Sequence, residues 1–493
     1  MANPMFDQLF APLAAQKDAL LILADGTQVS GQQFYAMIAQ QAHALVHVGV
    51  RPGDRVAVQV GKSVAALATY GACVAIGAVY LPLNPAYTAA EIGYFLSDAT
   101  PQVFICNPGT VAPAGPYMLT MDATGAGSLA DLAAGMPQVI DAVARRQTDL
   151  AALLYTSGTT GRSKGATLSQ RNLLSNAKVL VDHWQFTRDD VLLHALPIFH
   201  THGLFVATNV ALIARARMIF LPGFDAAQVM RLLPASTVMM GVPTFYTRLL
   251  DQPGLADAAQ GRRLFISGSA PLLAETHKAW EGVTGHRILE RYGMTETNMN
   301  TSNPYLGDRR AGTVGQPLPG VGLRIMGEGG PVPEGEVGVI EVRGDNVFQG
   351  YWQMPEKTAE ELRADGWFIT GDLGRMADGY LEIVGRAKDL VITGGYNVYP
   401  KEIELALDAL PGVVESAVIG LPHADFGEAV FAVIVGDVAA EAALAAVAPS
   451  LARFKQPKGA VVVRDLPRNA MGKVQKAALR AEYAVWFQKK ENS

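Results

Sequence analysis

The chain has 493 residues, of which 49% are apolar and 17% are charged, and its formal net charge is −5 at pH 7. This length suggests roughly two or three domains. The composition excludes a disordered chain, a coiled coil and a collagen-like repeat. The weakly acidic balance excludes the strong basicity of a nucleic-acid-binding protein. We therefore expect a large, mostly buried α/β core.

The two cysteines, Cys73 and Cys106, both lie among apolar residues. Two such residues exclude a disulfide scaffold and a thiolate metal cluster, and we expect two buried structural thiols. The first twelve residues contain no basic stretch followed by an apolar run, so we expect no signal peptide. The predicted compartment is the cytoplasm.

An uncharged segment from Val64 to Leu83 has the length of a membrane span. It contains Gly71, Gly77, Pro82 and many alanines but few large apolar side chains. We expect a helix packed inside an α/β domain and then a buried strand at 79–83. A membrane span is the alternative.

Strand-like and helical patterns alternate along roughly the first 320 residues. This alternation predicts a parallel sheet with helices on both faces. The expected strands lie at 20–24, 55–60, 79–83, 103–106, 191–196, 218–221, 238–242 and 264–270, with helices at 31–48 and 89–96 and a further helix in the uncharged segment.

After Pro319, short strands alternate with glycine and proline turns, which predicts a small antiparallel region. A new unit begins near Gly385, with a helix that Pro400 opens. We therefore expect a large N-terminal α/β domain, residues 1–385, and a small mobile α+β domain, residues 386–493. The tail of the second domain is basic, which fits either a solvated surface or phosphate binding.

A glycine- and hydroxyl-rich loop, Tyr155–Gly165 (YTSGTTGRSKG), follows the apolar strand LAALL. Glycines allow successive N–H groups to point in one direction, and such nests bind anions. The hydroxyl groups and Lys164 add donors and positive charge. The loop is not a Walker A motif, because it lacks the Gly-Lys-Ser/Thr of that motif. The density of donors directly after a buried strand favours a phosphate site over an ordinary linker.

The loop resembles the signature of the adenylate-forming superfamily, which includes acyl-CoA synthetases, luciferases and peptide-synthetase adenylation domains. Ser163 stands where many members carry proline, a departure that puts no chemistry in doubt. Four further segments resemble family motifs in the family's order: Tyr292–Glu296 (adenylate and magnesium), Thr370–Asp372 (ribose), Gly385–Asp389 (hinge) and Pro467–Lys473 (C-terminal lysine).

The resemblance implies a two-step reaction with ATP, Mg²⁺ and coenzyme A. A carboxylate first attacks the α-phosphate to give an acyl-adenylate, and a thiol then displaces AMP. By this resemblance Lys473 bridges the carboxylate and the α-phosphate, Thr295 touches the phosphate, and Glu296 and Thr156 bind Mg²⁺. The implied nucleotide-binding residues are Thr156, Ser157, Gly158, Thr159, Thr160, Gly161, Lys164, Ser269, Ala270, Glu290, Arg291, Tyr292, Gly293, Met294, Asp372 and Arg386. The implied hinge and coenzyme A residues are Lys388, Gly394 and Gly395.

The acid-binding residues are harder to assign. The spacing of His200 and His202 suggests a metal site, but no further Cys/His cluster accompanies them. The resemblance implies a catalytic gating role for His200. We expect Arg248 to pair a second carboxylate of the substrate, because an unpaired buried charge is costly. In the alternative, Arg248 faces solvent on a helix. Arg291 or His200 would then be the next candidate to bind the second carboxylate. The expected acid pocket comprises His200, Arg248, Ser269 and Met294.

Strings such as HALPIFHTHGLFVATN and ERYGMTETNMNTSNPY closely resemble the malonyl-CoA synthetase subfamily. This implies malonate as the acid, methylmalonate as a second substrate, and small-molecule substrates (a dicarboxylic acid, ATP and coenzyme A) with no nucleic-acid partner. The alternatives are a short-chain or aryl acid:CoA ligase, an adenylation domain that loads a carrier protein, and a non-catalytic nucleotide-binding protein. The sequence leaves the oligomeric state open.

Overall fold

The chain folds into two compact units in the computed structural model. The first comprises Met1–Gly322 and Val342–Phe368, and the second Leu323–Glu341 and Ile369–Ser493. The second unit thus takes in most of the antiparallel region, and a hinge at 385/386 stays a prediction. The structure describes residues 2–111, 115–156, 163–394, 396–423, 425–469 and 472–487.

A nine-stranded sheet in the first unit has the order β15-β14-β13-β12-β11-β9-β10-β1-β2. Neighbouring strands from β13 to β1 are parallel, and the pairs β1–β2, β13–β14 and β14–β15 are antiparallel. The strands are β1 (Ala19–Ile22), β2 (Gln28–Ser30), β9 (Val191–His194), β10 (Arg217–Phe220), β11 (Val238–Gly241), β12 (Leu264–Ser267), β13 (Leu289–Met294), β14 (Asn298–Ser302) and β15 (Gln316–Pro317).

A six-stranded sheet in the same unit has the order β6-β5-β3-β4-β7-β8. All its pairs are parallel except β7–β8, which is antiparallel. The parallel sheets predicted from the sequence are therefore confirmed, with antiparallel strands at their edges. The strands are β3 (Arg55–Gln59), β4 (Val79–Pro82), β5 (Val103–Cys106), β6 (Tyr117–Thr120), β7 (Leu150–Thr156) and β8 (Lys164–Ser169).

Three helices of the first unit begin at capping boxes. Ser30, Thr88 and Ser169 each form a capping box, in which side chain and backbone exchange hydrogen bonds across the first turn. The helices are α1 (Pro4–Leu9), η1 (Ala11–Ala15), α2 (Gly31–His47), α3 (Val64–Ile76), α4 (Ala89–Ala99), α5 (Ser128–Ala133), α6 (Gln170–His183), η2 (His202–Thr208), α7 (Asn209–Ala214), α8 (Ala226–Leu232), η3 (Leu233–Ala235), α9 (Pro243–Leu250), α10 (Leu255–Ala259), α11 (Ala274–Thr284) and α12 (Pro355–Glu361).

The uncharged segment forms α3 and then β4. Ser63 caps the start of α3, and Gly77 in a left-handed conformation ends it. Residues 66–76 of the helix are all buried. Within the described parts of the chain, no helix combines the length and the apolarity that crossing a membrane requires. The expectation of a buried helix followed by a strand is confirmed.

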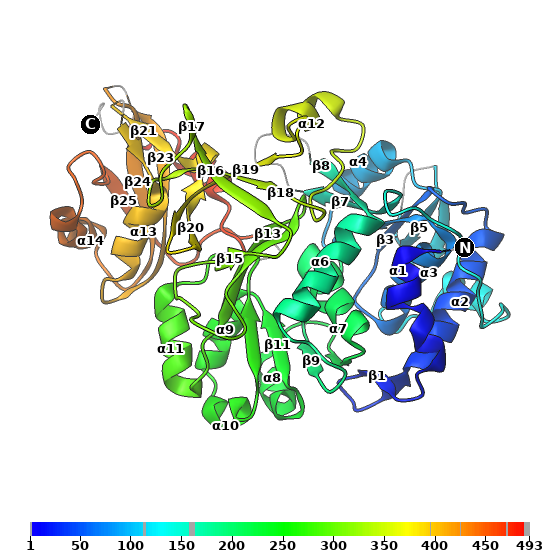
Figure 1. Ribbon diagram of the computed structural model, residues 1–493. Helices are drawn as coiled ribbons and strands as arrows, with labels where there is room; N and C mark the ends of the chain where they lie inside the picture. Colours follow the sequence, from blue (N-terminus) through cyan, green and yellow to red (C-terminus); the bar gives the residue numbers. More distant parts are fainter. Residues whose placement is uncertain are drawn as a thin grey trace. The chain divides into compact units, whose positions relative to one another are not determined.

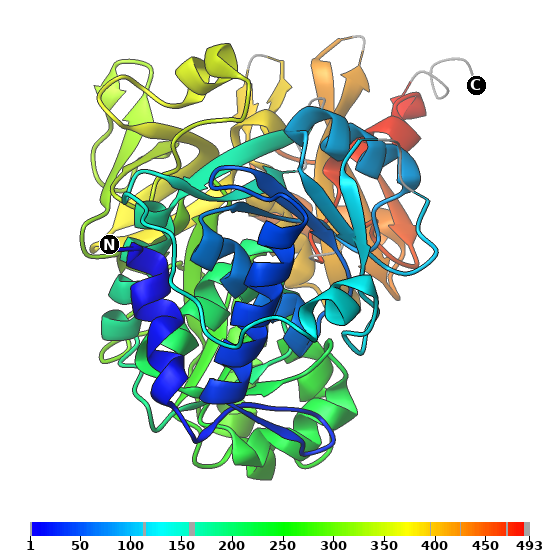
Figure 2. The ribbon, with the colours of Figure 1, turned by 90° about the vertical axis from the view of Figure 1, so that its right-hand side faces the viewer.

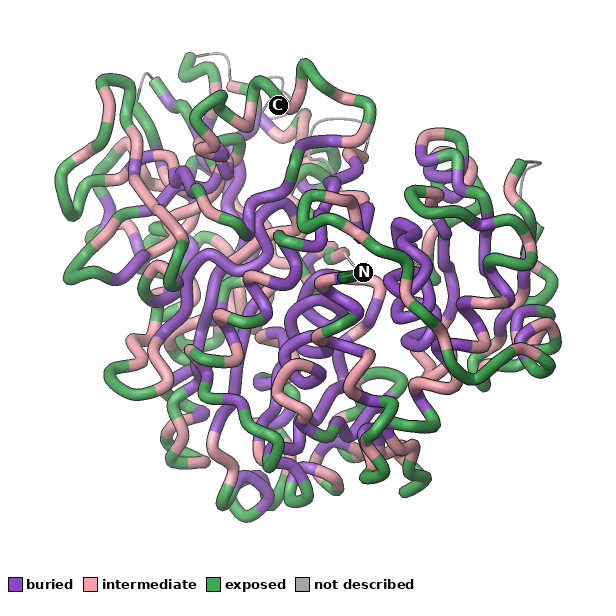
Figure 3. Tube along the Cα trace, turned by 45° about the vertical axis from the view of Figure 1, so that its right-hand side comes forward, coloured by how far each residue is buried: buried purple, intermediate pink, exposed green. Residues whose placement is uncertain are grey.

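The cores of the first unit lie between its sheets and helices. One core is formed where α8 to α11 cover the nine-stranded sheet and includes the buried Leu193, Phe265 and Trp280 (Figure 1). Figure 2 shows α1 and α2 in dark blue, and Phe6 of α1 contacts Tyr35 of α2 with ring centroids 6.2 Å apart. In Figure 3 the buried segments run as long purple stretches along the strands.

The second unit contains most of one five-stranded sheet, of order β17-β16-β18-β19-β20. It also contains all of a second five-stranded sheet, in which β22, β21, β24 and β23 are neighbours in that order and β25 pairs with β24. The predicted change to antiparallel strands after Pro319 is confirmed. The strands are β16 (Gly322–Gly327), β17 (Gly330–Pro331), β18 (Gly338–Arg343), β19 (Phe368–Ala377), β20 (Tyr380–Arg386), β21 (Val391–Thr393), β22 (Tyr396–Val398), β23 (Val413–His423), β24 (Gly427–Gly436) and β25 (Gly459–Val463). The helices are η4 (Ala387–Asp389), α13 (Pro400–Asp408), α14 (Ala440–Val447), η5 (Ala448–Ser450) and α15 (Lys476–Tyr483).

Candidate functional site

The predicted phosphate loop connects the two strands of an antiparallel hairpin. β7 and β8 pair so that Thr156 lies opposite Lys164. The Thr156 hydroxyl donates a hydrogen bond of 3.4 Å to the carbonyl oxygen of Lys164. Both ends of the loop are therefore fixed beside each other. Five predicted residues of the loop lie outside the described residues: Ser157, Gly158, Thr159, Thr160 and Gly161.

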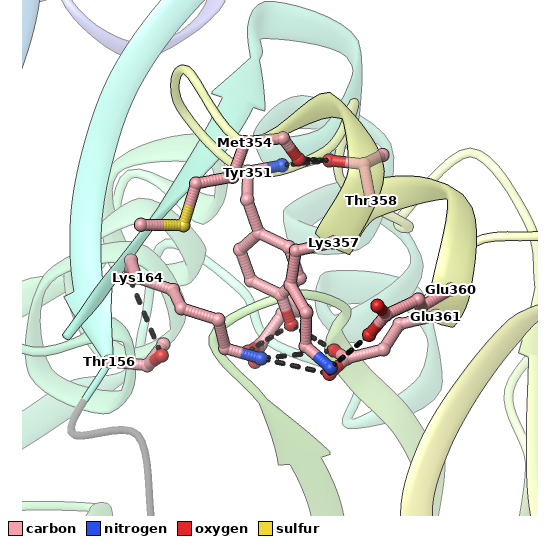
Figure 4. Close-up of polar contacts among 9 residues, drawn as sticks. Thr156, Lys164, Tyr351, Met354, Lys357, Thr358, Glu360 and Glu361 are labelled. Atoms are coloured by element: carbon pink, nitrogen blue, oxygen red, sulfur yellow. Dashed lines mark hydrogen bonds and ion pairs between the residues drawn. The ribbon is translucent and has the colours of Figure 1, made fainter. Parts of the chain in front are cut away.

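The Lys164 side chain extends from β8 to a carboxylate on α12. Its Nζ lies 3.0 Å and 3.1 Å from the two carboxylate oxygens of Glu361, and 4.1 Å from the ring centroid of Tyr351 (Figure 4). The two charged side chains are 18% and 22% exposed, so this ion pair is partly desolvated. A cation in such a place is attracted to phosphate more strongly than one in bulk water.

Glu296 is the predicted magnesium ligand, and it is buried in the turn between β13 and β14. The Tyr351 hydroxyl lies 3.1 Å from Oε1 of Glu296 and 2.5 Å from Oε2 of Glu361. No group of three or more His, Cys, Asp or Glu that could hold a metal occurs among the described residues. Mg²⁺ is commonly bound through one or two carboxylates, with phosphate oxygens and water completing its shell. Glu296 fits that mode of binding.

The adenylate motif occupies β13 and the turn that follows it. Glu290, Arg291 and Tyr292 are buried, whereas Met294 and Thr295 are partly exposed. Gly293 is required sterically, since a Cβ atom there would lie 1.8 Å from the carbonyl oxygen of Asn298. The strand therefore presents partly exposed side chains at its carboxyl end, where ligands of parallel α/β sheets bind.

Ser269 and Ala270 follow the neighbouring strand β12. Ser269 has a φ of +73°, an unfavourable conformation for a residue with a side chain, and such strain concentrates at functional sites. The ring Nδ1 of His202 lies 3.1 Å from the Ser269 hydroxyl oxygen. Because β12 and β13 are adjacent and parallel, Ser269 and Met294 lie at the same edge of the sheet.

His200 is partly exposed and lies two residues before the buried His202, which begins η2. Burial, together with the nearby charges of Arg291, His200 and His194, holds the pKa of His202 well below its ordinary value, so this ring is neutral at pH 7. Among the described residues, no group of three or more His, Cys, Asp or Glu includes these histidines.

The two candidate arginines for a second carboxylate differ sharply in burial. Arg248 is exposed on the last turn of α9. Arg291 is only 3% exposed, and its Nε and Nη2 have no hydrogen-bond partner among the described residues. Its guanidinium packs against Gly268, where a Cβ atom would lie 2.4 Å away. Burial lowers the pKa of Arg291 to about 9, which leaves it charged at pH 7.

The second unit brings Asp372 and Arg386 together. They lie opposite each other on β19 and β20, and Nε of Arg386 is 2.8 Å from Oδ1 of Asp372. Asp372 is 4% exposed. A carboxylate is a hydrogen-bond acceptor suited to the ribose diol.

Lys388 lies in η4, two residues after Arg386, and is exposed to solvent. Desolvation, with smaller contributions from the charges of Arg386, Lys473 and Arg480, lowers the pKa of Lys388 to about 8. Gly394 has a φ of +56° in the turn between β21 and β22, which favours glycine. Gly395 lies outside the described residues.

Replacing Lys388 with methionine is expected to stabilise the protein at pH 7 and to lose this advantage between pH 8 and 10.5. The folded state lowers the pKa of Lys388 from 10.5 to about 8, so across that range the unfolded chain binds more protons and wild-type stability rises with pH. Urea unfolding midpoints at pH 7, 8, 9 and 10 measure the difference, with exposed Lys17→Met as the control. A gap that stays constant with pH would contradict the expectation.

Lys473 is exposed in a tight turn of the basic tail. Its backbone N–H donates to Oδ1 of Asn469 at 3.0 Å, and the N–H of Asn469 donates to its carbonyl oxygen at 3.0 Å. Gly472 occupies the turn with a φ of +75°. The turn fixes the backbone of Lys473, and its long side chain carries the charge.

Tyr351 and Glu361 were not predicted from the sequence, although both contact predicted residues, Glu296 and Lys164. Glu361 is the last residue of α12, and carboxylates are unfavourable at helix C-termini unless cations compensate them. An acidic pair, Glu360-Glu361, at the end of a short helix is a signal that could have directed attention to this position.

The chain is similar to several known proteins. Residues 10–352 match the AMP-binding enzyme family, and residues 402–473 match the AMP-binding enzyme C-terminal domain. The chain is 55% identical to ATP-bound MatB from Rhodopseudomonas palustris, with a TM-score of 0.96 over 99% of this chain and 100% of that one. It is 34% identical to a feruloyl-CoA synthase of Amycolatopsis, over 93% of this chain and 94% of that protein.

A malonate–CoA ligase of Arabidopsis thaliana is 41% identical over 369 residues, which is 67% of this chain and 60% of that protein. The chain thus spans less than two thirds of this curated relative. The match to the family covers most of the first unit and part of the second, and it includes the phosphate loop and the adenylate motif. The chain belongs to the AMP-binding enzyme family.

Proposed function

We propose that the chain is an AMP-forming acid–thiol ligase that converts malonate, ATP and coenzyme A to malonyl-CoA, AMP and pyrophosphate. The names of two relatives, malonate–CoA ligase and feruloyl-CoA synthase, support the reaction class. The observation that carries the choice of acid is the buried guanidinium of Arg291, which has two nitrogens without a partner among the described residues.

In the first half-reaction, two anions must meet while a third leaves, so cations have to converge on the phosphates. Lys164 at the end of the loop and Lys473 in the tail supply these charges, and Thr295 contacts the α-phosphate. Glu296, with Thr156, would hold Mg²⁺, which neutralises charge on the phosphate oxygens. Asp372 and Arg386 hold the ribose.

In the second half-reaction, a thiol attacks the acyl carbonyl and AMP leaves. We propose that the small domain, from residue 386 onward, turns about Lys388 between the two steps. Gly394 and Gly395 then face the thiol arm of coenzyme A, and His200 gates its approach.

The second carboxylate of malonate pairs with Arg291 in this proposal. Arg291 lies on β13, three residues before Met294, and beside the Gly268-Ser269 segment at the end of β12. The exposure of Arg248 favours the solvent alternative for that residue. Removing charged groups from water is costly unless they are paired, and a carboxylate offers the guanidinium bidentate geometry.

An aryl or simple short-chain acid would leave Arg291 buried without an anion, which makes those alternatives less favourable. Methylmalonate keeps both carboxylates and is the expected second substrate. A non-catalytic nucleotide-binding protein would need neither Lys473 nor Glu296. The two cysteines are free and buried, as expected, and free thiols fit the proposed cytoplasmic location.

An ATP–pyrophosphate exchange assay over a panel of acids tests the proposal. We expect exchange with malonate to exceed that with methylmalonate, and both to exceed propionate and ferulate by at least about tenfold, which corresponds to 1.4 kcal/mol. Faster exchange with ferulate or propionate than with malonate would identify another acid as the substrate. No exchange with any acid, despite binding of ATP, would favour the non-catalytic alternative.

A further inference from the structure

Four side chains of the first unit form a continuous polar chain between two predicted sites. Lys164 contacts Glu361, Glu361 accepts a hydrogen bond from Tyr351, and the Tyr351 hydroxyl also lies within hydrogen-bond distance of Glu296. Figure 4 shows Lys164, Tyr351 and Glu361 converging from β8, the segment before α12 and the end of α12. The chain joins the lysine of the phosphate loop to the carboxylate proposed for Mg²⁺.

Glu361 is the centre of this chain. Its carboxylate faces two ammonium groups, with Nζ of Lys357 at 3.0 Å in addition to Lys164. Burial opposes its ionisation, but hydrogen bonds from Tyr351, Lys164 and Lys357 hold the pKa of Glu361 below its ordinary value. The helix that carries it has no buried residue. The position of Glu361 is therefore set mainly by these polar contacts.

Tyr351 has one hydroxyl proton and two carboxylate neighbours. The distances of 2.5 Å to Glu361 and 3.1 Å to Glu296 indicate that the proton is donated mainly to Glu361. The backbone of Tyr351 is fixed by a β-bridge to Ala166 and by a hydrogen bond of 2.9 Å from its N–H to the Thr358 hydroxyl. The Tyr351 hydroxyl is therefore held in a fixed position between the carboxylates of Glu361 and Glu296.

We propose that Tyr351 and Glu361 are positioning residues that hold Lys164 and Glu296 at the spacing required by a magnesium-bound polyphosphate. The inference rests on the proposed function of Lys164 and Glu296. A lysine side chain is long and flexible, and fixing it in advance lowers the entropy cost of binding. Lys164 has three N–H donors, so a contact with Glu361 leaves it able to bind phosphate as well.

Glu361→Gln tests the proposal, because it removes the charge but keeps the shape of the side chain. We expect the Kd of Mg·ATP, measured by calorimetry without acid, and the KM for ATP to rise at least about fivefold, while kcat at saturating ATP falls less than about threefold. Tyr351→Phe should act in the same direction. The double variant should be less impaired than the product of the two single effects, because the residues act through one network.

Glu360→Gln is the matched control, since Glu360 is exposed and pairs only with Lys357 among the ion pairs between described residues. It should bind Mg·ATP as the wild type does. Unchanged Mg·ATP affinity in Glu361→Gln would overturn the inference, and a lower melting temperature alongside that unchanged affinity would identify a purely structural ion pair. If the wild type binds Mg·ATP but fails in exchange with every acid, the proposed function fails while the binding comparison still decides this inference.

Discussion

Replacing Lys473 with alanine is expected to reduce ATP–pyrophosphate exchange with malonate by about 10²–10³-fold, the usual cost of losing one group that stabilises transition-state charge. Lys473 is exposed on a fixed turn, so its removal should not disturb the fold. Charge accumulates on the α-phosphate only while the adenylate forms. Thioester formation from supplied malonyl-adenylate and coenzyme A should therefore fall less than about tenfold.

Arg464→Ala provides the control for Lys473, because Arg464 is an exposed cation of the same basic segment. Exchange should be nearly unchanged in that variant. Equal losses in both half-reactions of Lys473→Ala would instead indicate that Lys473 supports the active protein in general. Measuring the two half-reactions separately is essential, because the overall rate cannot distinguish these outcomes.

The parts of the fold that depend on local pattern could be predicted from the sequence. The segment from Val64 to Leu83 reads as a helix and a strand, because Ser63 and Gly77 supply the start and stop of α3. Predicted strand ends were less accurate, since the strand expected at 264–270 ends at Ser267. Hydrophobic pattern marks the buried run, but hydrogen bonding to neighbours decides where the strand stops.

Contacts between distant segments could not be predicted in this way. Glu361 and Lys164 lie almost 200 positions apart, and neither the loop nor α12 carries a local signal for the other. Motif resemblance identified Glu296 but not Tyr351, which lies beside it. Such partners are set by tertiary packing, in which a β-bridge from Ala166 to Tyr351 brings the two regions together.

The choice between Arg248 and Arg291 shows the same limit. Helical spacing in the sequence allowed Arg248 to face either a pocket or solvent, and the structure exposes it on α9. Arg291 was assigned with the nucleotide motif, because sequence alone does not reveal that its guanidinium packs on Gly268. Burial, rather than residue type, separates the two candidates.

Replacing Arg291 with leucine is therefore expected to reduce kcat/KM for malonate at least about tenfold to a hundredfold. A hydrogen bond to a charged group contributes about 1.5–3 kcal/mol, and each 1.4 kcal/mol is one decade. The loss also leaves the second carboxylate of malonate unpaired in a buried place. Propionate lacks that carboxylate, so its kcat/KM should change far less, and the malonate-to-propionate ratio is the decisive measurement.

Arg248→Leu is the matched variant for this test, because it makes the same substitution at an exposed arginine. Its malonate-to-propionate ratio should stay close to that of the wild type. A fall in the ratio for Arg248→Leu alone would show that Arg248, rather than Arg291, binds the second carboxylate. Parallel losses for both acids in Arg291→Leu would make Arg291 a structural residue, and His200, partly exposed and beside His202, would become the next candidate. Melting temperatures of both variants separate these outcomes from a simple loss of folded protein.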